Sequence, residues 1–156
     1  MRLELFSPGK TKLDFIARGI DEYRGRLERF CPIELVVTRD HGARKGGDEE
    51  RARAEEGREL LGRLPKEALV VALDLSGRML SSEGLAALID TWEMEGRRRI
   101  AFVIGGFAGL SGEVLARADL RLSLSPMTFT HEMARLLLLE QLYRAFSIKH
   151  ATGYHR

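Results

Sequence analysis

The 156-residue chain is poor in the residues that build disulfide frameworks and zinc sites. Its one cysteine, Cys31, excludes an internal disulfide and any cysteine-cluster zinc site. No apolar run approaches the ~20 residues that span a bilayer. The first residues, Met1 to Phe6, are too few and too charged for a signal peptide. These absences predict a cytoplasmic protein with no membrane segment and no bound metal.

Net charge is also small, because 25 Lys and Arg face 23 Asp and Glu, which leaves +2. Hydrophobic residues make up 44% of the chain, enough to bury the core of one folded domain. Arginine outnumbers lysine 20 to 5. Arginine suits bidentate phosphate contacts and stacking on bases, but a GC-rich genome would favour the same residue. Composition alone therefore leaves nucleic-acid binding open.

Apolar residues recur with the periods of an α/β domain. We expect the first helix to be capped by Thr11, and a turn at Ser76-Gly77. Strands and helices alternate, which predicts one domain over 1–156: a mostly parallel sheet with helices on both faces. The expected strands are 1–6, 33–37, 69–73, 100–104 and 120–124, and the expected helices are 13–30, 48–63, 82–95, 112–118 and 131–148.

Ligands of parallel sheets bind beyond the carboxyl ends of the strands. Here those ends carry Asp74, the glycine loop 105–112 and the loop 125–130. The pattern Gly105-Gly106-x-x-Gly109 matches neither the dinucleotide fingerprint nor a P-loop, and suits either a ligand or a tight packing turn. Asp74 could likewise bind a ribose or an amine, or only close a turn.

The last helix carries a second group of candidates. His131-Glu132-x-x-Arg135 resembles the zinc-protease motif, but Arg135 replaces the second histidine, which excludes that site. His131, His150 and His155 lie in the last 26 residues and could exchange protons near neutral pH, or be exposed and idle. The apolar run 136–139 predicts a helix buried on several sides, in a subunit interface or a deep core.

Together and in order, these motifs resemble the RlmH (YbeA-like) family, small SPOUT-class methyltransferases of bacterial ribosomes. The resemblance spans the whole chain, and the combination is specific where each motif alone is weak. The matching segments are Leu73-Asp74, Ile104-Gly105-Gly106-x-x-Gly109-Leu110-Ser111, Ser123-Leu124-Ser125-x-Met127-Thr128, His131, Glu140 to Ala145 with Ser147-Ile148, and Tyr154-His155-Arg156.

The resemblance implies an α/β knot, a homodimer, and S-adenosylmethionine bound in the knot. It implies methylation of N3 of a pseudouridine in 23S ribosomal RNA within the assembled ribosome. By position, His131, His155 and Arg156 are candidates for a base or a stabilising cation, with Arg144 and Tyr154 on the substrate side. The cofactor-binding positions implied are Leu73, Gly105, Gly106, Ser125, Pro126, Met127, Thr128, Phe129 and Thr130.

The chain departs from the family pattern in three places. Thr130 and Gly153 stand where proline is usual, and Phe107-Ala108 replaces the usual Pro-Glu. Threonine can still cap a helix, whereas glycine at 153 predicts a more flexible tail. Two other functions stay open at this point: a non-catalytic RNA-binding module with the same fold, and a small nucleotide hydrolase.

Overall fold

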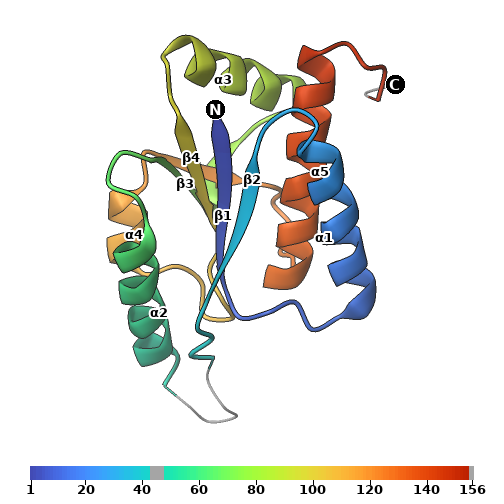
Figure 1. The fold of residues 1–156 in the computed structure, drawn as a ribbon. Helices are drawn as coiled ribbons and strands as arrows, with labels where there is room; N and C mark the ends of the chain where they lie inside the picture. The colour runs from blue at the N-terminus through green and yellow to red at the C-terminus, as the bar shows by residue number, and fades with distance from the viewer. Residues whose placement is uncertain (43–47, 155–156) are drawn as a thin grey trace.

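A computed structural model describes residues 1–42 and 48–154 of the chain. His155 and Arg156, two of the predicted catalytic residues, lie outside the described part. The sheet has five strands in the order β2-β1-β4-β3-β5, and every neighbouring pair is parallel (Figure 1). The predicted parallel sheet is therefore confirmed. The strands are β1 (Arg2–Pro8), β2 (Ile33–Thr38), β3 (Leu69–Met79), β4 (Arg99–Val103) and β5 (Leu120–Ser123).

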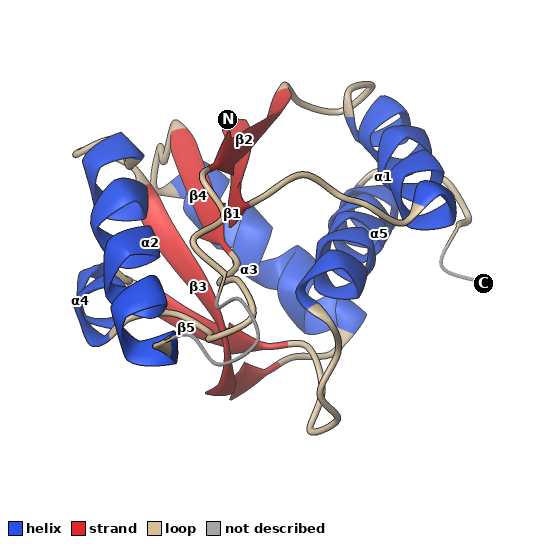
Figure 2. Cartoon of the chain, turned by 90° about the horizontal axis from the view of Figure 1, so that it is seen from below, coloured by secondary structure: helices blue, strands red, loops and turns tan. Residues whose placement is uncertain are grey.

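Helices cover both faces of the sheet, as predicted (Figure 2). One face carries α1 (Asp14–Leu27), α3 (Ser82–Met94) and α5 (His131–Lys149). The other carries α2 (Glu49–Arg63) and α4 (Gly112–Arg117). None of the helices described here is long and apolar enough to cross a membrane.

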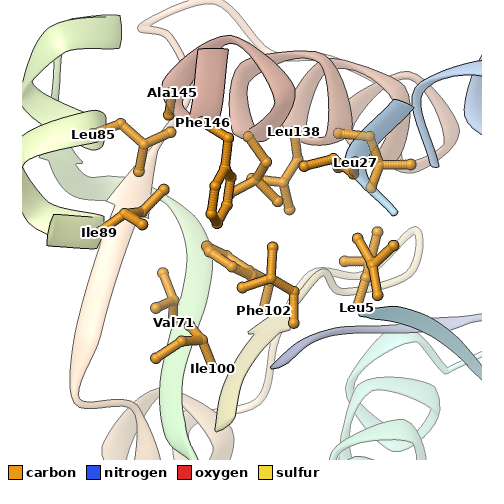
Figure 3. Close-up of a cluster of buried hydrophobic side chains, with 14 of the residues drawn as sticks. Leu5, Leu27, Val71, Leu85, Ile89, Ile100, Phe102, Leu138, Ala145 and Phe146 are labelled. Atoms are coloured by element: carbon orange, nitrogen blue, oxygen red, sulfur yellow. The ribbon is translucent and has the colours of Figure 1, made fainter. Parts of the chain in front are cut away.

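The larger core lies under α5. Phe102 of β4 and Phe146 and Leu138 of α5 are fully buried there and point toward one another (Figure 3). Helix α5 packs between α1 and α3, and each of its residues is buried or half-buried. The predicted burial of this helix on several sides is confirmed. Cys31 and Trp92 are buried core residues.

Strand β3 differs from the prediction. It does not end at Leu73 but continues to Met79, and both Leu73 and Arg78 pair with Leu122 of β5. Residues 74–77 do not pair with β5, and β3 pairs with β5 again from Arg78. At the return, a Cβ on Gly77 would lie 2.7 Å from backbone atoms of β5, so only glycine fits. The expected turn at Ser76-Gly77 is thus an excursion within one strand.

The predicted cap of α1 is wrong. The N-cap position is Leu13, which has no side-chain cap, and the Oγ1 of Thr11 instead accepts a hydrogen bond from Arg135 at 3.2 Å. The carboxylate of Glu132 accepts from the backbone N–H groups of Lys12 and Leu13 at 3.0 and 3.1 Å. A residue of α5 therefore stabilises the start of α1, which fixes these two helices to each other.

Candidate functional site

A cavity of about 700 Å³ opens at the carboxyl edge of the sheet. Its volume lies within the range of small-molecule sites. Three segments enclose it: the β3 excursion, the glycine loop after β4, and the loop from β5 to α5. The lining residues are Leu73, Asp74, Leu75, Ile104, Gly105, Gly106, Phe107, Ala108, Gly109, Leu110, Leu122, Ser123, Leu124, Ser125, Met127, Thr128, Phe129, Thr130, His131 and Ala134.

The structure brings together the residues predicted to bind the cofactor. Eight of the nine line the cavity, and Pro126, between Ser125 and Met127, does not. They come from segments up to 57 residues apart in the sequence (73 to 130), which the parallel sheet gathers at one edge. Their use in binding stays a prediction.

The glycine loop is folded tightly on itself. The N–H of Gly109 donates to the carbonyl of Gly106 at 3.1 Å, and Gly109 has a φ of +78°. A Cβ on Gly105 would lie 2.5 Å from the carbonyl carbon of Gly109, which is backbone and cannot rotate away. These glycines are needed for the turn itself, so the packing explanation holds for them even though they also line the cavity.

The loop from β5 to α5 is held by its own hydroxyl groups. The hydroxyl of Ser123 donates to the carbonyl of Ser125 at 3.1 Å, and the N–H of Met127 donates to the Ser125 hydroxyl at 2.9 Å. Thr130 is the N-cap of α5, and its side chain accepts from the N–H of Met133 at 3.2 Å. Threonine therefore does cap the helix at the position where the family usually has proline.

The cavity carries little charge. Its titratable lining residues are Asp74 and His131, and within the described part of the chain no lysine or arginine lines it. The Asp74 carboxylate accepts from the N–H of Ser76 at 2.9 Å, so it closes a turn, as one of the two interpretations expected. Apolar side chains stand at the mouth, where Phe107 and Met127 are 73% and 74% exposed. The cavity fits a flat apolar ring and a neutral or cationic chain better than a phosphate.

His131 is the one predicted catalytic residue that lies at the cavity among those described. It is the first residue of α5 and is half-buried. Burial lowers the pKa of its imidazole below the ordinary 6.5, and the charge of Arg135 lowers it further, while Glu132 and Asp40 oppose the shift. The imidazole is therefore neutral at pH 7 and can accept a proton from a bound group.

Arg135 binds the backbone at the end of β1. It is 3% exposed, and its guanidinium donates to the carbonyls of Pro8 at 2.5 Å and Gly9 at 3.0 Å. Burial lowers its pKa, and Glu132 and Asp40 oppose the shift. Arginine rather than a second histidine stands at position 135 because this side chain binds the backbone at the end of β1. In the described residues, no group of three or more His, Cys, Asp or Glu could hold a metal ion.

Arg144 and Tyr154 lie away from the cavity. Arg144 pairs with Glu140 at 2.6 Å, and its guanidinium carbon lies 4.8 Å from the centre of the Tyr154 ring. The hydroxyls of Tyr154 and Tyr23 are 3.1 Å apart. His131 and Arg144 are thirteen residues apart on α5, which is about 20 Å along a helix. Among the described residues, a single chain therefore does not bring Arg144 and Tyr154 to His131.

The tail takes a path that the family-typical proline could not follow. Gly153 has a φ of +82°, whereas proline is restricted to about −65°. Glycine at this position permits the turn that puts the Tyr154 ring 4.6 Å from Tyr143. The flexibility predicted for the tail stays a prediction, and Tyr154 has contacts that oppose it.

Comparison with known proteins gives a consistent result. The family described as "Predicted SPOUT methyltransferase" matches residues 1–155. The chain is 49% identical over 156 residues to the ribosomal RNA large subunit methyltransferase H of Desulfotalea psychrophila, with both chains fully covered. It is 46% identical over 155 residues to the protein of that name from Geotalea daltonii, covering 99% of each.

The fold is also found among solved structures. A probable methylase family protein from Haemophilus influenzae superposes with a TM-score of 0.55 at 14% identity, over 99% of this chain and 70% of that one. At this identity the likeness concerns the fold alone.

Proposed function

The chain belongs to the SPOUT methyltransferases, in the family of ribosomal RNA large subunit methyltransferase H, and on this premise we propose that it methylates ribosomal RNA. The donor is S-adenosylmethionine and the acceptor is N3 of a pseudouridine in 23S RNA, on the assembled ribosome in the cytoplasm. The observation that carries the proposal is the weakly charged cavity built by the three loops that the family resemblance assigns to the cofactor.

The residues present fit this donor. When bound, S-adenosylmethionine supplies a methyl group activated by its sulfonium charge. The glycine loop and the loop 125–130 would hold it with backbone groups, and Leu73 and Ile104 provide apolar walls. The cavity has no cation in the described residues to hold a triphosphate, which argues against the nucleotide hydrolase considered from the sequence.

The chemistry asked of the protein is mostly placement, since methyl transfer is an in-line displacement. A pseudouridine N3–H must also lose its proton. His131 lines the cavity and burial keeps its imidazole neutral, which supports its proposed role as the proton acceptor. His155 and Arg156 keep their proposed part in this step on the strength of the resemblance alone.

A second copy of the chain would complete the site. Arg144 is about 20 Å along α5 from His131, and Tyr154 lies against Arg144, so these two residues can serve the same reaction only if another protomer presents them. The exposed side chains of Leu75, Phe107 and Met127 at the cavity mouth give a partner or the RNA an apolar surface to cover. We infer a homodimer whose two cavities each face the partner's tail.

Calorimetric titration with S-adenosylmethionine and with ATP tests the donor. Binding of S-adenosylmethionine alone is the expected result, and preferential binding of ATP would overturn the proposal. Tritium transfer from the labelled donor to ribosomes that lack the modification then tests the reaction. Donor binding without transfer to any ribosomal particle would instead support a non-catalytic RNA-binding module.

A further inference from the structure

Helix α2 contacts the glycine loop at two points, although it lies on the other side of the sheet from α5. A Cβ added to Gly106 would lie 2.7 Å from Oε2 of Glu56 in α2. A Cβ added to Gly57 would lie 2.8 Å from the Cβ of Ser111 and closer still to its hydroxyl. Consecutive residues of α2 thus touch the beginning and the end of the loop that lines the cavity.

The carboxyl group of Glu56 joins two segments. It is 2% exposed, and its Oε1 accepts from the backbone N–H of His41 at 3.1 Å. Its Oε2 faces Gly106 and has no hydrogen-bond partner among the described residues. Burial raises the pKa of this carboxyl and Asp40 adds to the rise, while the N–H of His41 opposes it, as does the nearby N–H of Gly106, which does not reach hydrogen-bond geometry with Oε2. A buried carboxyl oxygen without a hydrogen-bond partner lowers the stability of the fold.

The loop needs such support. It contains Gly105, Gly106 and Gly109, and glycine backbone is the most flexible in a chain. The neighbouring segment 39–42 is held independently by Glu59, whose carboxylate accepts from the N–H of Arg39 at 3.1 Å. Glu59 offers no contact to the glycine loop, so the two functions of this face of α2 can be separated.

We propose that Glu56 and Gly57 are positioning residues for the glycine loop: through them α2 fixes the shape of the cavity and so the affinity for the methyl donor. Neither residue lines the cavity. Glu56 fills the space beside Gly106. Gly57, which has no side chain, leaves room for Ser111. The identity of the ligand rests on the proposed function.

Two variants and two matched controls test this. Glu56→Ala and Gly57→Ala should each weaken S-adenosylmethionine binding by about tenfold or more in calorimetry, because each displaces the glycine loop that lines the cavity; tenfold corresponds to about 1.4 kcal/mol. Glu59→Ala removes the contacts to segment 39–42 and an i,i+4 pair with Arg63, and Gly62→Ala adds a Cβ that meets nothing within 4 Å. Both controls should stay within about twofold of the wild type.

Three further readouts separate positioning from a general loss of structure. Turnover at saturating donor should fall by less than about threefold in Glu56→Ala, because the change acts on KM for the donor rather than on kcat. Glu56→Gln, which keeps an acceptor for His41 and the volume beside Gly106, should restore most of the affinity. Hydrogen exchange of the Gly109 amide in the free protein should be faster in Glu56→Ala and Gly57→Ala and unchanged in the controls.

The outcomes are distinguishable. If the wild type does not bind S-adenosylmethionine, the proposed function falls, and Gly109 exchange alone decides whether α2 holds the loop. If the wild type binds and Glu56→Ala and Gly57→Ala bind equally well, the inference is overturned. Equal losses in the controls, or no rescue by Glu56→Gln, would overturn it as well.

Discussion

Arg135 offers the sharpest test of how α5 holds the segment between β1 and α1. We predict that Arg135→Met destabilises the fold strongly, although methionine keeps most of the apolar stem. The guanidinium satisfies the carbonyls of Pro8 and Gly9 and the hydroxyl of Thr11. These groups belong to the segment that leads from β1 to α1, so the change should loosen the start of α1 as well.

The magnitude follows from the burial of each acceptor. The bond to the Pro8 carbonyl is buried, and the bonds to Gly9 and Thr11 are part-buried. An unsatisfied buried carbonyl costs about 1–3 kcal/mol, and each part-buried group about 0.5–1 kcal/mol. Removing a guanidinium that burial disfavours returns part of this. The net loss should be about 2–3 kcal/mol, which is a drop in Tm of about 4–12 °C for a chain of this length.

Urea unfolding followed by circular dichroism, at one fixed protein concentration, measures the loss. Arg144→Met is the matched control, because it removes an arginine of the same helix that makes a part-buried i,i+4 pair with Glu140. That pair and its ring contact contribute less than about 1 kcal/mol. Equal losses in the two variants would refute the reasoning, as would a loss below about 1 kcal/mol for Arg135→Met.

Three further changes have defined outcomes. Gly105→Ala places a Cβ 2.5 Å from the Gly109 carbonyl carbon, so donor affinity in calorimetry should fall about tenfold or more; unchanged affinity would contradict the tight turn. His131→Gln should lower turnover at saturating donor by about 10²–10⁴-fold with little change in donor affinity, and the wild-type rate should decline only below pH 6.5, because burial lowers this pKa. For Glu132 burial raises the pKa, but the backbone N–H groups and nearby positive charges outweigh it and lower the pKa below 4.5, so its stabilising effect is present above that pH and is lost on acidification through the folded pKa. In Glu132→Gln the urea midpoint of unfolding should depend less on pH across this acid range. A pH dependence like that of the wild type would show that the carboxylate charge does not stabilise the fold.

The periodicity of apolar residues predicted the strands, the helices and the parallel sheet, because those patterns depend on local spacing. Predictions from residue type were wrong at positions where residues far away in the sequence supply the hydrogen-bond or strand partner. Threonine is a common N-cap residue, but the hydroxyl of Thr11 accepts a hydrogen bond from Arg135 instead. Glu132, 120 residues from Lys12, satisfies the N–H groups at the start of α1. Ser76-Gly77 has the composition of a turn, yet the strand returns to the same neighbour after it.

Much of the cavity could also be predicted, since the carboxyl ends of parallel strands meet at one edge. The contribution of α2 could not. Its charged composition predicts a surface helix, and nothing in the local sequence shows that Glu56 is buried against Gly106. The available signal was Gly57, an isolated glycine inside a helix, which often marks close packing. The separation of His131 from Arg144 could be predicted, since both lie on the expected helix 131–148, but the packing of Tyr154 against Arg144 could not.

The threading of the chain that the family resemblance implies, and the pairing of two protomers, stay predictions. The identity of the reaction is tested by its product. Ribosomes lacking the modification should be incubated with the protein and S-adenosylmethionine, and their large-subunit RNA digested for nucleoside mass spectrometry. We expect one new methylated nucleoside, N3-methylpseudouridine. A methyl group on any other nucleoside, or none despite donor binding, would contradict this expectation.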